Sequence, residues 1–313
     1  MISLSTSFIS GLIDDGESLV ETLAGFEIDG IELEYRISSP TLEQMRLPLK
    51  QSVLKVSSIH NFCPIPGLTP PVKGSGDLFL LSSRDMEERR RAVQWTIRTI
   101  EQANDVEAPV VILHCGRVEI SPELEQLYQY YHTEQIDSIE AQAFKQKKLD
   151  ERDRHAPGHV DALLFALDRL MRHAEKHGVM LGLENRYHYH ELPTLEVFHR
   201  LLTEFKGGPI GYWHDTGHAH ANEILGIIAP GALPRGFEEQ LIGMHWHDAV
   251  GLEDHLAPGQ GEIDFNALKP YINKNMPIVI ELKPGTASPK VKESIRFTRE
   301  FLMPVTKNHD NIL

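Results

Sequence analysis

Eight short apolar segments, separated by amphipathic ones, constrain the fold of this chain more than any other feature. Segments such as 86–105 and 159–178 carry apolar residues three or four positions apart, a spacing that is typical of helices. The apolar runs are too short for helices of that kind and are predicted to be strands. They comprise residues 2–6, 30–34, 53–60, 109–115, 179–185, 209–215, 241–248 and 277–282.

Strands that alternate with helices predict parallel βα units, and eight such units close into a (β/α)8 TIM barrel. A doubly wound open sheet is the alternative. That fold usually carries a glycine-rich phosphate turn after its first strand, and no G-x-G-x-x-G occurs here. We therefore expect an α/β chain in which residues 1–313 form a single barrel domain.

One polar segment after the fourth strand exceeds an ordinary connection. Residues 117–158 are compatible with helix and are closed by Ala156-Pro157-Gly158, so we expect a helical insertion there. It could be a solvated surface excursion. Because βα loops lie at the catalytic face of a barrel, a lid or a partner contact is the alternative.

Net charge and cysteine content limit the partners and the compartment. With 45 acidic and 31 basic residues, the formal charge of −14 disfavours nucleic acid as a ligand. No run of about 18 apolar residues predicts a membrane span, and the N-terminus lacks the basic start of a secretory signal. Cys63 and Cys115 are far apart in sequence and are expected to be reduced thiols, which favours a cytoplasmic protein.

Carboxylates and imidazoles end the predicted strands from the second to the eighth. In a TIM barrel these positions line the active site. Since the strands are otherwise apolar, such groups need partners, and a shared divalent cation supplies one. The residues are Glu32, Glu34, His60, His114, Glu184, His214, Asp215, His245 and Glu281.

Four of these residues are the strongest candidates for a metal site. Glu184, Asp215, His245 and Glu281 end four successive strands, and three carboxylates with one imidazole suit Mn, Mg, Co or Zn. His247 shares a strand face with His245 and is an alternative ligand. Asp215 could instead serve as the N-cap of the next helix.

Arg186 follows the fifth strand closely. Its guanidinium could hold an anionic or polyol substrate, or it could pair with a neighbouring acid. The sequence contains no G-x-S-x-G, P-loop or H-E-x-x-H motif, so nothing indicates a nucleophilic triad or a helical zinc motif.

Several motifs together resemble the xylose isomerase-like TIM-barrel superfamily. They are LGLEN, HDTGH, GMHWHD, DHLAPGQGEIDF and VIEL, in this order. The resemblance to the epimerase branch implies one metal ion held by Glu184, Asp215, His245 and Glu281. It also implies that Glu184 and Glu281 act as the acid and base.

The same superfamily includes AP endonuclease family 2, related to endonuclease IV, which uses three zinc ions. That resemblance implies further candidate ligands at His60, His114, His218 and His255, with Glu253 where the family has Asp.

The preferred hypothesis is a metal-dependent isomerase or epimerase of a sugar, sugar phosphate or related polyol, with one ion rather than three. Its substrate-binding residues would be His60, His114, Arg186, His218 and His255. The alternatives are an endonuclease IV-like zinc phosphodiesterase acting on abasic DNA or a small phosphoester, and a metal-bound barrel without activity. A homo-oligomer is compatible with each of them.

Overall fold

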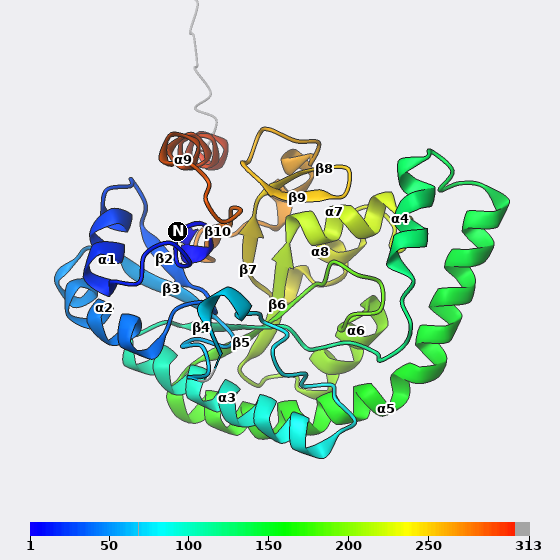
Figure 1. The fold of residues 1–313 in the computed structure, drawn as a ribbon, viewed down its shortest axis with the longest axis horizontal. Coiled ribbons are helices and arrows are strands. Elements are labelled where there is room, and N and C mark those ends of the chain that lie inside the picture. The colour runs from blue at the N-terminus through cyan, green and yellow to red at the C-terminus, as the bar shows by residue number, and fades with distance from the viewer. Residues whose placement is uncertain (68, 304–313) are drawn as a thin grey trace, which may run out of the picture.

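The structure, a computed structural model, describes residues 1–67 and 69–303 and contains a closed barrel of eight parallel strands (Figure 1). Neighbouring strands follow the order β1-β10-β7-β6-β5-β4-β3-β2. The predicted barrel, and all eight predicted strands, are therefore confirmed. The strands are β1 (Ile2–Ser5), β2 (Gly30–Leu33), β3 (Lys55–His60), β4 (Val110–Leu113), β5 (Met180–Glu184), β6 (Ile210–Asp215), β7 (Leu241–Trp246) and β10 (Ile278–Ile280).

Helices connect the strands and surround the barrel. Several begin with a side chain that accepts a hydrogen bond from a backbone N–H of the first turn, as Asp15, Ser38 and Asp85 do. The α-helices are α1 (Gly16–Ala24), α2 (Ser39–Gln51), α3 (Met86–Asp105), α4 (Leu124–His132), α5 (Ile139–His177), α6 (Leu195–Glu204), α7 (Thr216–Ile224), α8 (Ala232–Gly236) and α9 (Ser288–Leu302). Short 3-10 helices cover Thr6–Phe8, Pro71–Lys73, Glu238–Gln240 and Phe265–Tyr271.

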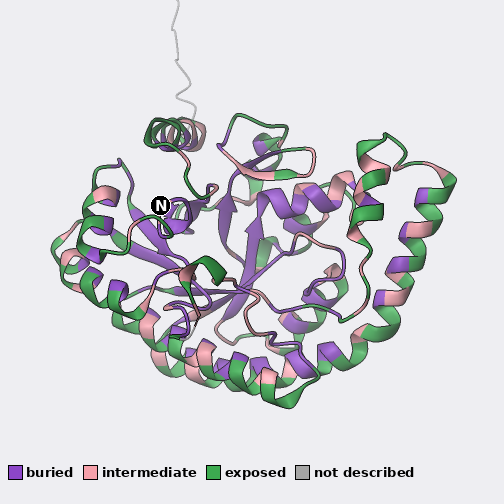
Figure 2. Ribbon diagram, in the orientation of Figure 1, coloured by how far each residue is buried: buried purple, intermediate pink, exposed green. Residues whose placement is uncertain are grey.

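Alternation along the strands divides the apolar residues between two cores. Val110, Ile112, Trp213 and Val279 form one cluster, while their neighbours in sequence pack in the larger cluster shared with the helices. Gly243 leaves room for Trp213, because a Cβ there would lie 2.1 Å from Cζ3 of that ring. In Figure 2 the strands of the barrel are almost wholly buried and the outer helix faces are exposed. The polar strand-end residues therefore lie above a packed apolar layer.

The predicted insertion does not end where the sequence indicated. Residues 124–132 form α4, but α5 continues without a break from Ile139 through Pro157 and Gly158 to His177. The expected boundary at Ala156-Pro157-Gly158 is therefore wrong. Pro157 removes one backbone hydrogen-bond donor, but burial of Val160, Leu163 and Leu167 on its C-terminal side stabilises the continuous helix. In Figure 1 the first part of α5 projects beside the barrel together with α4.

A hairpin follows β7 at the carboxyl end of the barrel. Strands β8 (Asp248–Val250) and β9 (Glu253–Leu256) pair antiparallel, and α7 contacts both of them. The Asp248 carboxylate accepts hydrogen bonds from the backbone N–H groups of Gly259, Gly261 and Ile263, which fixes the loop after the hairpin.

Two other expectations concern the chain as a whole. Cys63 and Cys115 are buried free thiols, as predicted. Within residues 1–67 and 69–303, no helix combines the length and hydrophobicity that a membrane span requires.

Candidate metal centre

Four strands bring the predicted ligands together at the carboxyl end of the barrel. Glu184, Asp215 and His245 belong to β5, β6 and β7, and Glu281 follows β10 directly. The Nδ1 atom of His245 lies 2.9 Å from Oε1 of Glu184 and 3.2 Å from Oε2 of Glu281. It lies 3.5 Å from Oδ2 of Asp215. All four side chains are buried, so the three carboxylates and the imidazole face one confined point.

His60 and His114 form a second group around Glu184. Nδ1 of His60 lies 2.9 Å from the carbonyl oxygen of Asn61, and Nδ1 of His114 lies 2.9 Å from Oδ2 of Asp77. These oxygens can only accept, so both Nδ1 atoms carry hydrogen, and the neutral form of either ring has its lone pair on Nε2. The two Nε2 atoms lie 3.4 and 3.0 Å from Oε2 of Glu184.

Oε2 of Glu184 is a buried oxygen that accepts no hydrogen bond. Three nitrogen atoms surround it, on His60, His114 and Arg186, the last at 3.7 Å. The guanidinium nitrogen is a donor, but the Nε2 lone pairs of the two neutral imidazoles and Oε2 repel one another at this buried point unless a cation or a proton lies between them. This group is therefore suited to a divalent metal ion.

A third group lies under the β8–β9 hairpin. It comprises His218, Asp254 and His255, whose candidate ligand atoms lie within 4.8 Å of one another. Nδ1 of His218 donates to the carbonyl of Asn185 at 3.0 Å, which leaves Nε2 facing Asp254 at 3.9 Å. Nδ1 of His255 lies 3.1 Å from Oδ1 of Asp254.

Glu253, a candidate further ligand in the sequence, does not lie in this group, and Asp254 occupies the expected position. Glu253 is exposed and pairs with Lys283. The physical reason is the backbone at His255, whose φ of 55° interrupts the strand alternation. Asp254 and His255 therefore both approach the centre, although they are adjacent in sequence.

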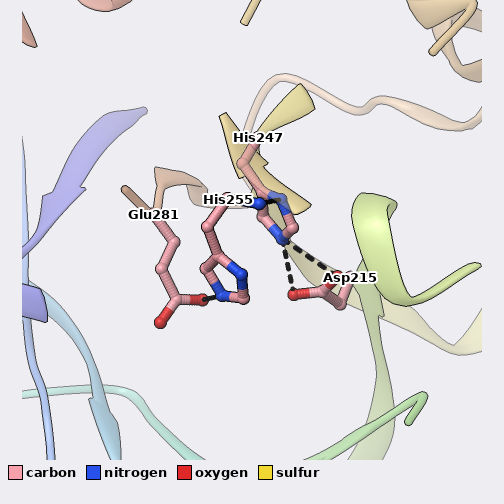
Figure 3. A group of neighbouring side chains, drawn as sticks. All are labelled: Asp215, His247, His255 and Glu281. Carbon is pink, nitrogen blue, oxygen red and sulfur yellow. Dashed lines mark hydrogen bonds and ion pairs between the residues drawn. The ribbon is translucent and has the colours of Figure 1, made fainter. Parts of the chain in front are cut away.

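His247 and His245 are both fully buried, but they have different hydrogen-bond partners. Its Nδ1 accepts a hydrogen bond from the backbone N–H of His255 at 2.9 Å, so its Nε2 carries hydrogen. That Nε2 lies 3.0 Å from both carboxylate oxygens of Asp215 (Figure 3). The backbone N–H of His255 thus uses the lone pair of the His247 ring, whereas Nδ1 of His245 faces only carboxylate oxygens, which favours His245 over His247 as a ligand. The same view shows His255 directed toward Glu281, at 3.7 Å.

Arg186 pairs with acids, as one of the two sequence interpretations expected. Its NH2 group lies 2.8 Å from Oδ2 of Asp77 and 3.2 Å from Oε1 of Glu191. Its buried NH1 and Nε donate no hydrogen bond. Asp77, in the loop after β3, therefore contacts both His114 and Arg186, and nothing in the sequence pattern marked it.

The buried charges shift one another's pKa values. Burial raises the pKa of the Glu184 carboxyl, but His245 and His114 outweigh burial and hold it well below its usual range. Burial lowers the pKa of His114, and Arg186 adds to this, but Asp77 and Glu184 outweigh both and raise it to about 9. In the metal-free chain, the second proton on His114 therefore compensates part of the carboxylate charge, and a metal ion would replace it.

Asp215 has two roles at once. Its Oδ1 accepts a hydrogen bond from the backbone N–H of His218 at 2.7 Å, so it is the N-cap of α7. Its Oδ2 faces His245 and His247. The two sequence interpretations of this residue are compatible, because a carboxylate has two oxygens.

A profile of the xylose isomerase-like TIM barrel family matches residues 20–301. The chain belongs to this family. A search of curated proteins found no match to the sequence. The family includes enzymes that the motifs above resemble, and the closed barrel agrees with it.

Solved structures share the fold over nearly the whole chain. A D-tagatose 3-epimerase-like protein has 20% identity and a TM-score of 0.67, with 96% of each chain covered. The 3-keto-D-glucoside 4-epimerase of E. coli has 14% identity and a TM-score of 0.66, covering 96% of this chain and 98% of its own. A putative xylose isomerase from Rhodospirillum rubrum has 14% identity and a TM-score of 0.70, covering 97% and 99%. At these identities the likeness concerns the fold alone.

Proposed function

We propose that the chain is a divalent-metal-dependent isomerase or epimerase of a sugar, sugar phosphate or related polyol. The observation that carries this is the convergence of Glu184, Asp215 and Glu281 on Nδ1 of His245, within 2.9–3.5 Å. A metal ion bound there would polarise a substrate carbonyl. Sugar epimerases among the structures that share this fold support the substrate class.

The two glutamates would transfer the proton. Glu184 and Glu281 reach the centre from β5 and from the end of β10, which are separated in the barrel by β6 and β7. Burial raises the pKa of Glu281, but His245 and His255 hold it below its usual value. Both carboxylates are therefore ionised, so either could remove a proton from carbon. The other would take up a proton from solvent and donate it to the neighbouring carbon or to the opposite face, while the first would release the abstracted proton to solvent.

Substrate oxygens would lie against the remaining polar groups. His60, His114, His218 and His255 border the ligand atoms, and Arg186 has unused donors beside Glu184. These five residues would orient the substrate and exclude water around the reacting carbon.

Proton exchange with solvent tests this proposal. The enzyme, purified without chelator, would be incubated in D2O with a panel of ketoses, aldoses and their phosphates, and deuterium at carbon would be followed by NMR. Glu184→Gln and Glu281→Gln should each lower turnover by about 100-fold or more. Wild-type turnover in either variant would contradict the acid–base assignment.

A second candidate, metal-dependent hydrolysis of a phosphoester, is favoured by the two additional groups of ligand atoms. Six carboxylates meet at the centre: Glu32, Asp77, Glu184, Asp215, Asp254 and Glu281. Among the described residues, their only Lys or Arg partner is Arg186. With Arg186 compensating one of the six carboxylates, five negative charges remain. One dication neutralises only two of them, whereas three dications would neutralise all five.

Counting metal ions distinguishes the two candidates. Elemental analysis that finds one ion per chain, together with deuterium exchange, supports the isomerase or epimerase. Three ions per chain, together with cleavage of a phosphodiester or abasic-site duplex, supports the hydrolase. One ion and no cleavage would eliminate the second candidate.

A further inference from the structure

Glu32 is a buried carboxylate to which neither proposed function assigns a role as metal ligand, acid or base. It lies in β2, one residue before the strand ends, with 0% exposure, and it belongs to none of the groups of candidate ligand atoms within the described residues. Its Oε2 lies 3.1 Å from Nε2 of His245 and accepts a hydrogen bond from Oγ of Ser58 at 2.8 Å. No lysine or arginine pairs with it within residues 1–67 and 69–303. Since an unpaired buried carboxylate is costly, His245 is its principal partner.

The contact crosses the interior of the barrel. Strand β2 is separated from β7 by β1 and β10, and the two residues lie 213 positions apart in sequence. The pair therefore forms only when the barrel closes, and it holds the His245 ring from the side opposite the ligand carboxylates.

This contact decides which nitrogen of His245 carries the hydrogen. An ionised carboxylate only accepts, so Nε2 is the donor toward Glu32. Nδ1 of the neutral ring then keeps its lone pair, and it faces Glu184, Asp215 and Glu281. In the other tautomer Nδ1 would donate to Glu184 and could not bind a cation.

We propose that Glu32 is a positioning residue that holds the hydrogen of His245 on Nε2 and so makes Nδ1 the metal-binding nitrogen. The inference rests on the proposed metal centre. Partners of this kind commonly change metal affinity by about 10–100-fold when they are removed.

Metal affinity tests the proposal without reference to activity. Zn²⁺ dissociation constants would be measured by competition with a chelator for wild type, Glu32→Gln and Glu32→Met. Glu32→Met should bind zinc about 10–100-fold more weakly, while Glu32→Gln, which keeps an accepting oxygen, should lose less. The matched control is Glu34→Gln, a buried carboxylate two residues further on that pairs with Arg36, and it should bind zinc as the wild type does.

Nitrogen-15 NMR of the zinc-loaded wild type tests the tautomer even if Glu32→Met does not fold. The expected spectrum shows zinc on Nδ1 and hydrogen on Nε2 of His245, whereas zinc on Nε2 would overturn the proposal. Wild-type affinity in a folded Glu32→Met variant would overturn this inference alone. A wild type that binds no zinc would overturn the metal centre and this inference with it.

Discussion

Nδ1 of His114 lies 2.9 Å from Oδ2 of Asp77, and the same oxygen is 2.8 Å from NH2 of Arg186. A loop carboxylate thus holds a candidate metal ligand and a buried guanidinium together. The loop passes close to the site, because a Cβ on Gly76 would lie 2.6 Å from Nδ1 of His114. The loop after β3 is therefore part of the centre.

Asp77→Asn should weaken metal binding and lower stability together. The amide cannot accept as strongly from both His114 and Arg186, so we expect about 10-fold weaker zinc binding and a loss of about 1–3 kcal/mol in the free energy of unfolding. Chelator competition and urea unfolding measure the two effects. Asp161→Asn, in an exposed pair with Arg200, is the control and should change stability by less than about 1 kcal/mol. An unchanged zinc affinity in Asp77→Asn would show that Asp77 does not support His114.

His245 and His247 should differ when each is replaced by alanine. His245→Ala removes a proposed ligand, so we expect metal to be lost from the Glu184, Asp215 and Glu281 group. His247→Ala removes only the support of Asp215, so the ion should remain with affinity reduced by about 10–100-fold. Elemental analysis after dialysis against weak chelator checks this. The opposite order of effects would make His247 the ligand.

Acid should destabilise the protein through His190, a buried residue whose Nδ1 has no hydrogen-bond partner. Burial lowers the pKa of His190 from 6.5 to about 4. The unfolded chain therefore binds this proton more tightly than the folded chain does. The contribution of neutral His190 to the free energy of unfolding is full above pH 6.5 and is lost as pH falls toward 4. The shift corresponds to at most about 2 kcal/mol between pH 7.5 and pH 5.

His190→Gln removes this dependence. Between pH 7.5 and pH 5 the wild type should lose up to about 2 kcal/mol more free energy of unfolding than the variant, as measured by urea unfolding. His132→Gln, at an exposed position, is the control and should follow the wild type. Parallel pH profiles for wild type and His190→Gln would refute the assignment.

Gly251→Ala should destabilise the hairpin that carries Asp254 and His255. Gly251 has φ of 54°, and a Cβ there would lie 2.9 Å from the hydroxyl oxygen of Tyr131 on α4. Gly207→Ala is the matched control, because its φ is 86° and no atom lies within 4 Å of the added Cβ.

Both glycine variants carry backbone strain of about 1 kcal/mol. Any additional loss of stability in Gly251→Ala measures the contact with Tyr131 of α4. We expect a larger fall in melting temperature for Gly251→Ala, together with weaker metal binding. Equal melting temperatures would mean that α4 does not restrain the hairpin.

The periodicity of the sequence predicted the barrel because each strand and helix is a local pattern. Strand ends in a barrel converge, so the proximity of the candidate ligands Glu184, Asp215, His245 and Glu281 could be predicted without coordinates. The end of the helical segment could not, since Pro157 and Gly158 indicate a break that packing of α5 overrides.

What the sequence by itself determined is the fold and the kinds of atoms at the carboxyl end of the barrel, because both follow from short-range alternation of apolar and polar residues. Only the tertiary structure decided which nitrogen of each imidazole is free. It brings Glu32 to His245, Asp77 to His114 and the backbone of His255 to His247. It also places Asp254, rather than the predicted Glu253, beside His218 and His255. Glu32 and His245 lie 213 positions apart, and Asp77 and His114 lie 37 apart, so local patterns in the sequence do not reveal these contacts. The contact between His255 and His247 spans eight positions and depends on how the hairpin folds over the site.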